Sequence, residues 1–567
     1  MSQKTSVGNE HLVKIENLKT WLDTDNETVK AVDGVSFNIE KGETFCLVGE
    51  SGSGKSILAL SIIQLLPARI SSHPEGKILF DWRKQTGLGD LGKTSEAVYQ
   101  QVDMLELDES QLCNIRGSRI AMIFQEPMTS LNPVDSVGEQ IMEALLLHHP
   151  EMSDDSARDR ALKAMHEVQI KDAETRFDNY PHELSGGQRQ RIMIAMALAC
   201  EPDLLIADEP TTALDVTVQA EVLKLIKELQ ERKKMSVLFI THDFGVVSQI
   251  ADKVGVMKQG KLVEVGETSQ VLQKPQHDYS KKLLAAVPEN LPRRKKENNG
   301  ALVNKALIEV RDLNVYFPIR KGVLQRVVDH VRAVDGVSVD INQGKIVALV
   351  GESGSGKTTF GRAILQLLQP TAGSVKLSGH ELVGLTNKEL QPWRKKMQIA
   401  FQDPQSSLNP RLLIAKTITE PMQVHGIGGS DEERIELASQ VMEAVQLKRE
   451  FLWRYPHEFS GGQRQRIGLA RALALNPEFI VCDEITSALD VSVQAEVLQL
   501  LQEIRKQRDL TLLFITHNIA VVEYLSDETI VLKNGKVVEQ GLTDDVCGNP
   551  QNAYTQKLLA AVPRLNF

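Results

Sequence analysis

The sequence TFCLVGESGSGKS occupies residues 44–56, and a near copy, IVALVGESGSGKT, occupies residues 346–358. Each copy joins an apolar run of strand type to the pattern GxxxxGK[S/T], and a helix-like segment follows, in the first copy Ile57–Leu66. Glycines in such a loop let successive backbone N–H groups face phosphate oxygens, and the next helix adds partial positive charge at its N-terminus. The two stretches predict two phosphate-binding loops, each between a strand and a helix.

In these loops Lys55 and Lys357 are expected to neutralise the β- and γ-phosphates, and the hydroxyls of Ser56 and Thr358 to ligate Mg²⁺. A Gly/Ser-rich turn before a lysine is conceivable for one match alone, but two matches in the same context favour nucleotide sites. The predicted ATP-binding loop residues are Gly49, Glu50, Ser51, Gly52, Ser53, Gly54, Lys55 and Ser56, and Gly351, Glu352, Ser353, Gly354, Ser355, Gly356, Lys357 and Thr358.

The chain of 567 residues is a duplicated unit. SGGQRQRI recurs with an offset of 275 (185 and 460), whereas GESGSGK recurs with an offset of 302 (49 and 351), so the first copy has about 27 additional residues in between. A surface insertion around Asp81–Asp108 accounts for them best, because this stretch is polar and has little periodicity. The composition of Glu289–Lys305 is that of a linker, which predicts domains at 1–290 and 306–567 with a linker at 291–305.

Short, nearly continuous apolar runs alternate with helical patterns in both copies. This alternation is typical of a parallel sheet that is covered on both faces, so the predicted fold class is α/β, twice over. The predicted strands are Thr44–Val48, Leu204–Ala207 and Val237–Ile240, and Ile346–Val350, Phe479–Cys482 and Leu512–Ile515.

Two of these strands end in a pair of carboxylates, Asp208-Glu209 and Asp483-Glu484. A strand-end Asp beside a phosphate loop can hold Mg²⁺, and the following Glu can act as a general base on water. Strand-end carboxylates alone are often helix caps. Here each pair lies at the same distance after its SGGQ segment (209 − 185 and 484 − 460 are both 24), which favours the catalytic interpretation.

The SGGQ segments offer a serine hydroxyl and backbone N–H groups at a helix start, which is a second anion cradle. A lone SGG is more often a turn, but both copies continue into Gln-Arg-Gln-Arg and an apolar helix. The candidate residues here are Ser185, Gly187 and Gln188, and Ser460, Gly462 and Gln463.

Composition narrows the possible functions. The formal net charge of −10 disfavours a nucleic-acid partner. No apolar stretch approaches the roughly 20 residues that span a bilayer, and the N-terminus lacks the pattern of a signal peptide. The five cysteines have no CxxC spacing, so neither a disulfide framework nor a zinc site is expected, and Cys46 and Cys482 are predicted core residues. We expect a cytosolic protein that reaches a membrane only through a partner.

With these motifs in place, nearly the whole chain resembles the ATPase domains of ATP-binding cassette (ABC) transporters. The resemblance implies two tandem P-loop NTPase domains, each with a mainly parallel sheet core, an antiparallel β subdomain and a helical subdomain. It also implies Mg²⁺-sensing glutamines at Gln125 and Gln402, and catalytic histidines that sense the γ-phosphate at His242 and His517 beside the bases Glu209 and Glu484. Asp208 and Asp483 are further implied Mg²⁺ ligands, together with Ser56, Thr358 and the two glutamines. Leu214-Asp215 and Leu489-Asp490 match the loop that links the two sites.

The family pairs its domains head to tail, so the resemblance implies that each SGGQ segment completes the site of the other copy. An aromatic residue stacks on adenine in the family, and Phe317 is the candidate in the second copy. Leu22, beside Trp21, holds the matching place in the first copy, which leaves that assignment weak. After the Asp-Glu pair the first copy has Pro210, as is usual in the family, whereas the second has Ile485.

Tyr-Pro-His-Glu before each SGGQ segment (Tyr180–Glu183 and Tyr455–Glu458) and the tails 274–288 and 549–563 resemble peptide-importer ATPases. Residues 317–330 are similar to the fused ATPases of Yej-type importers of oligopeptides and microcin C, and fused glutathione-importer ATPases look similar as well. The implied partners are two transmembrane permeases, which contact 126–143 and 403–424, and an extracytoplasmic solute-binding protein. The implied location is peripheral, on the cytoplasmic side of the inner membrane. No iron–sulfur cluster is expected, because no cysteine cluster follows either tail.

Two alternatives stay open at this point. A ribosome-associated factor with two ABC domains would have a long charged helical linker and basic surfaces, and the short linker and negative charge oppose it. A DNA-repair ABC ATPase would need zinc-binding cysteine pairs, which the sequence lacks.

Overall fold

The computed structural model describes residues 11–24, 27–83, 99–125, 130–212, 214–292, 305–322, 326–402, 407–487 and 489–565. The chain divides into two compact units. The first comprises Met1–Leu214, Val218–Ala285 and Pro563–Phe567, and the second comprises Asp215–Thr217 and Ala286–Val562. The predicted domain limits at 290 and 306 stay predictions, since most of the linker lies outside the described residues.

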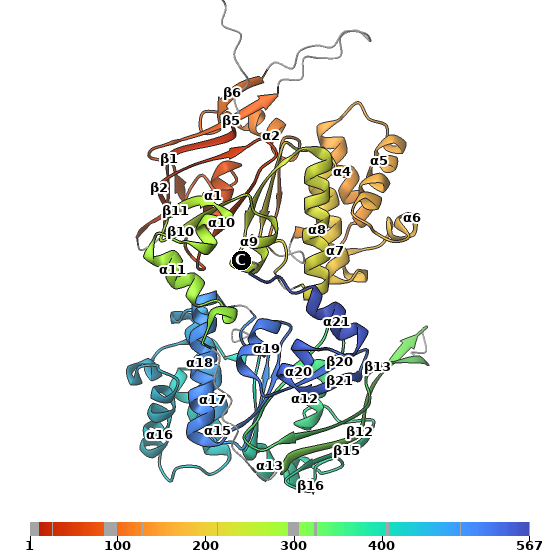
Figure 1. Cartoon of the computed structure of the whole chain (residues 1–567), viewed down its shortest axis with the longest axis vertical. Helices are drawn as coiled ribbons and strands as arrows, with labels where there is room; N and C mark the ends of the chain where they lie inside the picture. The colour runs from red at the N-terminus through yellow and green to blue at the C-terminus, as the bar shows by residue number, and fades with distance from the viewer. Residues whose placement is uncertain are drawn as a thin grey trace, which may run out of the picture. The chain divides into compact units, whose positions relative to one another are not determined.

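A six-stranded sheet forms the centre of the first unit, in the order β11-β10-β3-β9-β8-β7 (Figure 1). Its pairs are parallel except β10 with β11. Every residue of β3, β8 and β9 is buried, as expected for strands that are covered on both faces. The predicted α/β class is confirmed. The strands are β3 Thr44–Val48, β7 Ile120–Ile123, β8 Leu204–Asp208, β9 Ser236–Ile240, β10 Lys253–Lys258 and β11 Lys261–Glu267.

A second sheet of the first unit is antiparallel, in the order β2-β1-β5-β6 with β4 on β1. Its strands are β1 His11–Asp23, β2 Thr28–Glu40, β4 Ser71–Ser72, β5 Lys77–Arg83 and β6 Tyr99–Asp103. The stretch 81–108, which was predicted to be a surface insertion, contains strand β6, and this strand pairs with β5. This edge strand contains polar residues such as Gln100 and Gln101, so its sequence lacks the apolar pattern by which strands are predicted. Residues 84–98 lie outside the described residues.

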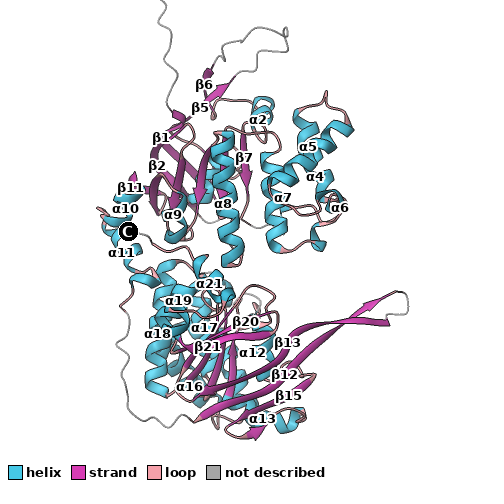
Figure 2. Cartoon of the chain, turned by 45° about the vertical axis from the view of Figure 1, so that its right-hand side comes forward, coloured by secondary structure: helices cyan, strands magenta, loops and turns pink. Residues whose placement is uncertain are grey.

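The helices of the first unit pack in different places. Leu58 and Ile62 of α1 lie in one buried cluster with residues of both sheets, so α1 is packed between them. Helices α4, α5 and α7 contact one another and form a helical part, and α7 contacts β7 (Figure 2). The short helix α6 contacts α5 in this helical part, and Leu112 and Ile115 of α2 join the buried cluster of the two sheets. The helices are α1 Lys55–Ile62, α2 Glu109–Ile115, α4 Val137–His148, α5 Asp154–Glu167, α6 Ala173–Arg176, α7 Gly186–Leu198, α8 Val216–Lys233, α9 Phe244–Ile250, α10 Thr268–Gln273 and α11 Asp278–Ala285.

The helix after the first loop differs from its predicted range Ile57–Leu66. It begins at Lys55, directly after Gly54, and ends at Ile62. Gln64 has φ of 53°, a left-handed backbone that a continuing helix cannot contain.

The second unit repeats this architecture. Its central sheet has the order β17-β18-β19-β14-β20-β21, and its antiparallel sheet the order β13-β12-β15-β16. The strands are β12 Ala306–Lys321, β13 Arg326–Asn342, β14 Ile346–Val350, β15 Ala372–Leu377, β16 His380–Glu381, β17 Met397–Ala400, β18 Phe479–Asp483, β19 Thr511–Ile515, β20 Glu528–Lys533 and β21 Lys536–Leu542. The helices are α12 Lys357–Ile364, α13 Asn387–Lys396, α15 Ile414–Val424, α16 Asp431–Ala444, α17 Gly461–Leu473, α18 Val491–Arg508, α19 Ile519–Leu525, α20 Thr543–Gly548 and α21 Ala553–Ala560.

One difference between the units is the length of the first hairpin. Strands β12 and β13 continue beyond the sheet as a two-stranded ribbon, which Figure 2 shows reaching away from the second unit. Phe317 pairs with Val331, whereas the matching pair of the first unit is Leu22 with Val29, so the second hairpin has seven more residues (331 − 317 against 29 − 22). No described helix has the length and apolar character needed to cross a membrane.

Candidate functional site

Both phosphate-binding loops follow a fully buried central strand and lead into a helix, as predicted. Gly54 has φ of 101°, and a Cβ there would lie 2.1 Å from the carbonyl oxygen of Ala31. Gly356 has φ of 103°, with Ala333 O at 2.0 Å. Neither position can hold a side chain without displacing backbone, which explains why both loops require glycine before the lysine.

The loop lysines are held by the loops themselves. Lys55 Nζ donates to the carbonyl oxygens of Gly49 and Glu50, at 2.8 and 2.9 Å. Lys357 makes the equivalent two bonds at the same distances, and burial lowers its pKa. Both lysines are only 6% exposed. Neutral carbonyl oxygens do not compensate the charge of a buried lysine, so binding of an anion such as phosphate stabilises the lysine strongly.

The strand-end aspartates lie beside the loop hydroxyls. Thr358 Oγ1 donates to Asp483 Oδ1 at 2.9 Å, and burial raises the pKa of both Asp208 and Asp483. Asp208 Oδ1 is buried and has no hydrogen-bond partner among the described residues. An unpartnered carboxylate oxygen beside a hydroxyl is a donor set that fits Mg²⁺ and its water shell. The described residues contain no group of three or more His, Cys, Asp or Glu side chains that could hold a metal ion by themselves.

The structure brings Glu209, His242 and Gln125 together. His242 Nδ1 lies 3.3 Å from Glu209 Oε1, and Gln125 Nε2 donates to Glu209 Oε2 at 3.1 Å. Burial raises the pKa of Glu209, but the bond from His242, its charge, and the hydroxyl of Thr212 outweigh burial and lower the pKa to about 2. This carboxylate is therefore ionised at neutral pH, as a general base must be.

The second unit repeats the cluster. His517 Nδ1 lies 3.5 Å from Glu484 Oε1, Gln402 Nε2 donates to Glu484 Oε2 at 2.8 Å, and the bond and charge of His517 lower the pKa of Glu484 against the effect of burial. Both glutamates have φ of 47°, in the left-handed region, which is unusual for a residue with a side chain. Replacement of Pro210 by Ile485 leaves this arrangement unchanged.

The SGGQ segments form helix starts with a capping box. Ser185 Oγ accepts from Gln188 N and Gln188 Oε1 accepts from Ser185 N, and Ser460 and Gln463 do the same. The N–H of the glutamine is thus already bonded, so the expected cradle is reduced to the glycine N–H groups and the serine hydroxyl. A Cβ on Gly187 would lie 2.6 Å from Val218 Cγ1, so this position has no room for a side chain.

The aromatic candidates differ in their surroundings. Tyr316 donates its hydroxyl to Asp335 at 2.6 Å and lies under the guanidinium of Arg332, whereas Phe317 is 41% exposed. Phe317 is thus the accessible ring. The strand register gives Leu22 the place that corresponds to Phe317.

Two contacts of the loops were not anticipated from the sequence. Tyr279 and Tyr554, in the tails of the two copies, bond to the second loop residue, Glu50 or Glu352. The signal was available, because both tyrosines are part of the repeated tail. The expected permease segments are described only in part, since 126–129 and 403–406 lie outside the described residues.

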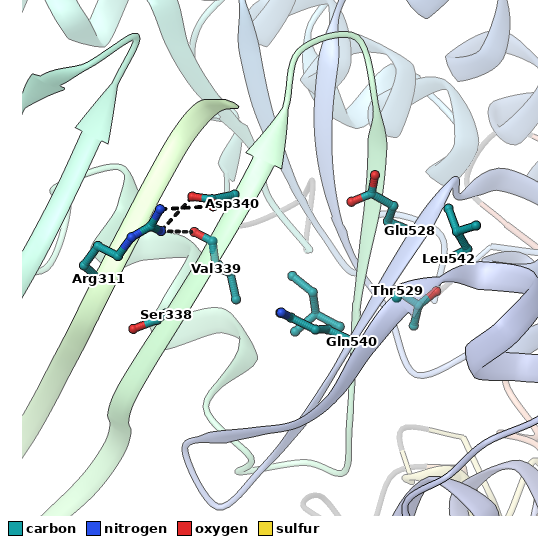
Figure 3. Close-up of a pocket in the computed structure, with 10 residues that line it drawn as sticks. Arg311, Ser338, Val339, Asp340, Glu528, Thr529, Gln540 and Leu542 are labelled. Carbon is teal, nitrogen blue, oxygen red and sulfur yellow. Dashed lines mark hydrogen bonds and ion pairs between the residues drawn. The ribbon is translucent and has the colours of Figure 1, made fainter. Parts of the chain in front are cut away.

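A surface pocket of the second unit lies elsewhere, and it includes none of the predicted site residues (Figure 3). It opens where Val339 takes the place of Phe37, which stacks on Phe45 in the first unit with ring centroids 4.6 Å apart. An ion pair between Arg311 and Asp340 closes one side. The pocket is lined by Arg311, Ser338, Val339, Asp340, Glu528, Thr529, Ile530, Gln540, Gly541 and Leu542.

The loops, the carboxylate pairs and the SGGQ helices define an ATP-binding cassette, and comparison with known proteins agrees. The ABC transporter family model matches residues 32–212 and 334–487, and the model of the oligopeptide/dipeptide transporter C-terminal region matches 263–308 and 538–567. The chain belongs to the ATP-binding proteins of ABC transporters. It is an ATP-binding enzyme whose ATP hydrolysis is coupled to transport, and the predicted resemblance is confirmed.

Two relatives match nearly the whole chain. The peptidoglycan transport ATP-binding protein YejF of Agrobacterium fabrum (strain C58 / ATCC 33970) is 47% identical over 550 residues, which cover 97% of this chain and 96% of the relative. The glutathione import ATP-binding protein GsiA of Escherichia coli (strain K12) is 44% identical over 583 residues, covering 99% and 91%. The solved ATP-binding cassette MJ0796 bound to ADP and Pi is 28% identical, with a TM-score of 0.38, and covers 45% of this chain and 98% of that chain.

Proposed function

We propose that the protein energises the import of peptides or peptide-like compounds from the cytoplasmic side of a bacterial inner membrane. The observation that carries the proposal is the match of both tails to the oligopeptide/dipeptide transporter C-terminal region, in a chain with two complete ATPase cassettes. The names of the two relatives support it, because glutathione is a tripeptide and peptidoglycan contains short peptides. A ribosome-associated role is not favoured, since these relatives are import or transport proteins.

The proposed partners are two membrane permeases and an extracytoplasmic solute-binding protein. A chain with no described membrane-spanning helix can act on a membrane only through another protein or a surface contact. The substrate would bind to those partners, so this chain supplies the energy and not the binding pocket.

The proposed chemistry at each site uses the residues described above. The loop N–H groups and Lys55 or Lys357 hold the β- and γ-phosphates. Ser56 with Asp208, and Thr358 with Asp483, would hold Mg²⁺ together with Gln125 and Gln402, and the bound ion would supply positive charge against the phosphates. Glu209 and Glu484 accept a proton from the attacking water, and His242 and His517 keep these carboxylates ionised and contact the γ-phosphate.

Each site is proposed to be completed by the SGGQ segment of the other copy, in a head-to-tail pair. Site one would add Ser460, Gly462 and Gln463, and site two would add Ser185, Gly187 and Gln188. In the closed state the γ-phosphate would contact both the phosphate-binding loop of one copy and the SGGQ segment of the other. ATP would therefore bind the closed state more tightly than the open state, and hydrolysis would remove this difference in affinity. Closure and reopening would switch the permeases between outward- and inward-facing states.

The test is peptide uptake by proteoliposomes that contain the chain and its two proposed permeases, with the proposed solute-binding protein outside and ATP inside. We expect uptake of a labelled oligopeptide or of glutathione that depends on ATP. Lys55→Ala with Lys357→Ala should abolish uptake, whereas Lys227→Ala, on the exposed face of α8, should not. Transport of neither compound class, with ATP hydrolysis intact, would contradict the proposed substrate.

A further inference from the structure

A tyrosine of each C-terminal tail reaches the phosphate-binding loop of its own unit. Tyr279 Oη donates to Glu50 Oε2 at 3.1 Å and accepts from Glu50 N at 3.4 Å. In the second unit Glu352 N donates to Tyr554 Oη at 3.1 Å. The two pairs are separated by 229 and 202 residues, a difference equal to the insertion in the first copy, so the contact is duplicated with the fold.

The rings of both tyrosines are buried, and each is packed against a lysine. They are 6% and 8% exposed, and a lysine ammonium lies over each ring, Lys258 at 4.7 Å and Lys533 at 4.6 Å from the ring centre. Burial raises the pKa of Tyr554 to about 12, so its hydroxyl keeps its proton at neutral pH. A rigid, buried hydroxyl can fix a backbone group more firmly than an exposed one can.

The tail that carries each tyrosine is tied to the central sheet. The carboxylate of Glu264, on β11, accepts from the backbone N–H groups of Gln276 and His277 at 2.7 and 3.1 Å. Glu539, on β21, accepts from the two equivalent N–H groups at the same distances. The tail helix therefore starts at a defined point of the sheet, which places its tyrosine against the loop.

The loop peptide that receives the tyrosine is bonded on both sides. The carbonyl oxygen of Gly49 accepts from Lys55 Nζ at 2.8 Å, and the N–H of Glu50, on the same peptide, donates to Tyr279 Oη at 3.4 Å. Gly49 has φ of 154°, so an unbraced peptide here has freedom that phosphate binding would have to remove. Fixing that peptide in advance reduces the entropy lost on binding.

We propose that Tyr279 and Tyr554 are positioning residues that hold the phosphate-binding loops in the shape that receives ATP. The C-terminal region, matched by the oligopeptide/dipeptide transporter model, is thereby a structural part of each nucleotide site. The proposal rests on the ATP sites assigned under Proposed function. Neither tyrosine touches the reacting atoms, so their contribution is to nucleotide affinity and not to the chemical step.

The test uses Tyr279→Phe, Tyr554→Phe and the double variant in the assembled transporter. Phenylalanine keeps the buried ring and its lysine and removes only the hydroxyl. Loss of the hydrogen bond to the loop N–H predicts a two- to tenfold weaker affinity at the altered site, measured with a fluorescent ATP analogue. Tyr279→Phe also loses the bond to the Glu50 carboxylate. The KM for ATP should rise by a similar factor in the double variant, while kcat stays within about twofold and the melting temperature falls by no more than a few degrees.

Tyr524→Phe is the matched control, because Tyr524 in α19 is equally buried and its hydroxyl has no hydrogen bond to a loop among the described residues. An unchanged affinity in the double variant, or an equal loss in Tyr524→Phe, would overturn the proposal. The affinity for the ATP analogue is measured in the absence of hydrolysis, so it tests the tyrosines alone. The catalytic assignment is tested by a different result, because full turnover in Glu209→Gln with Glu484→Gln would refute the catalytic role of the glutamates and leave the affinity measurement unaffected.

Discussion

At the scale of single residues, the decisive feature is how each glutamate proposed as the general base is kept ionised inside a buried site. Burial alone would raise the pKa of Glu209, and His242 with Thr212 reverses this, so that the pKa falls to about 2. The hydrogen bond from Gln125 holds the second carboxylate oxygen. The histidine therefore has two proposed tasks, one toward the γ-phosphate and one toward the base.

This dual task predicts a change in pH dependence. In His242→Ala with His517→Ala, burial continues to raise the pKa of each glutamate while the strongest opposing contact is lost, so the pKa rises. The base is then protonated at a higher pH than before. We expect a lower turnover overall, and the acid limb of kcat/KM for the residual activity should move to higher pH. The measurement is phosphate release between pH 5 and 9; normalised profiles that superimpose would contradict the role assigned to the histidines.

At the scale of elements, the buried strands and the loops were predictable from the sequence and other parts were not. The runs 44–48 and 346–350 coincide with β3 and β14, because a strand covered on both faces must be apolar throughout. Strand β6 was missed, since an edge strand with Gln100 and Gln101 has no such pattern. The contact of Tyr279 with Glu50 joins residues 229 apart, so the repeated tail pointed to the tyrosine but no local pattern identified its partner.

The segments that follow Gln125 and Gln402 give a prediction about how ATP hydrolysis is coupled to the permeases. Val134 and Val424 lie in the segments expected to meet the permeases, and they are 73% and 61% exposed. Removing an exposed valine from water against a partner stabilises the contact, and an aspartate there would oppose it. Val134→Asp and Val424→Asp should therefore lower peptide uptake at least tenfold while affinity for ATP stays within twofold. Leu147→Asp is the control, because Leu147 is 74% exposed outside those segments. Loss of nucleotide binding in the valine variants would mean that they serve the fold.

At the scale of the whole molecule, one chain contains two cassettes of the same design, and the described residues of each form the proposed catalytic cluster of glutamate, histidine and glutamine. The distances in the two clusters agree closely: 3.3 and 3.5 Å from histidine to glutamate, and 3.1 and 2.8 Å from glutamine to glutamate. One sequence difference adjoins the clusters, Pro210 against Ile485, and larger ones are the insertion of the first copy and the longer ribbon of the second (Figure 2). Such a chain should hydrolyse ATP at both sites.

The most direct measurement is the rate of phosphate release by the assembled transporter with each catalytic glutamate changed in turn. A general base contributes about 10²–10⁴-fold, so Glu209→Gln and Glu484→Gln should each lower turnover markedly, and the double variant should fall by about 10²-fold or more while still binding ATP. Glu231→Gln, on the exposed face of α8, should have wild-type turnover. Phosphate release at the wild-type rate by either single variant would contradict the claim that both sites of the chain hydrolyse ATP.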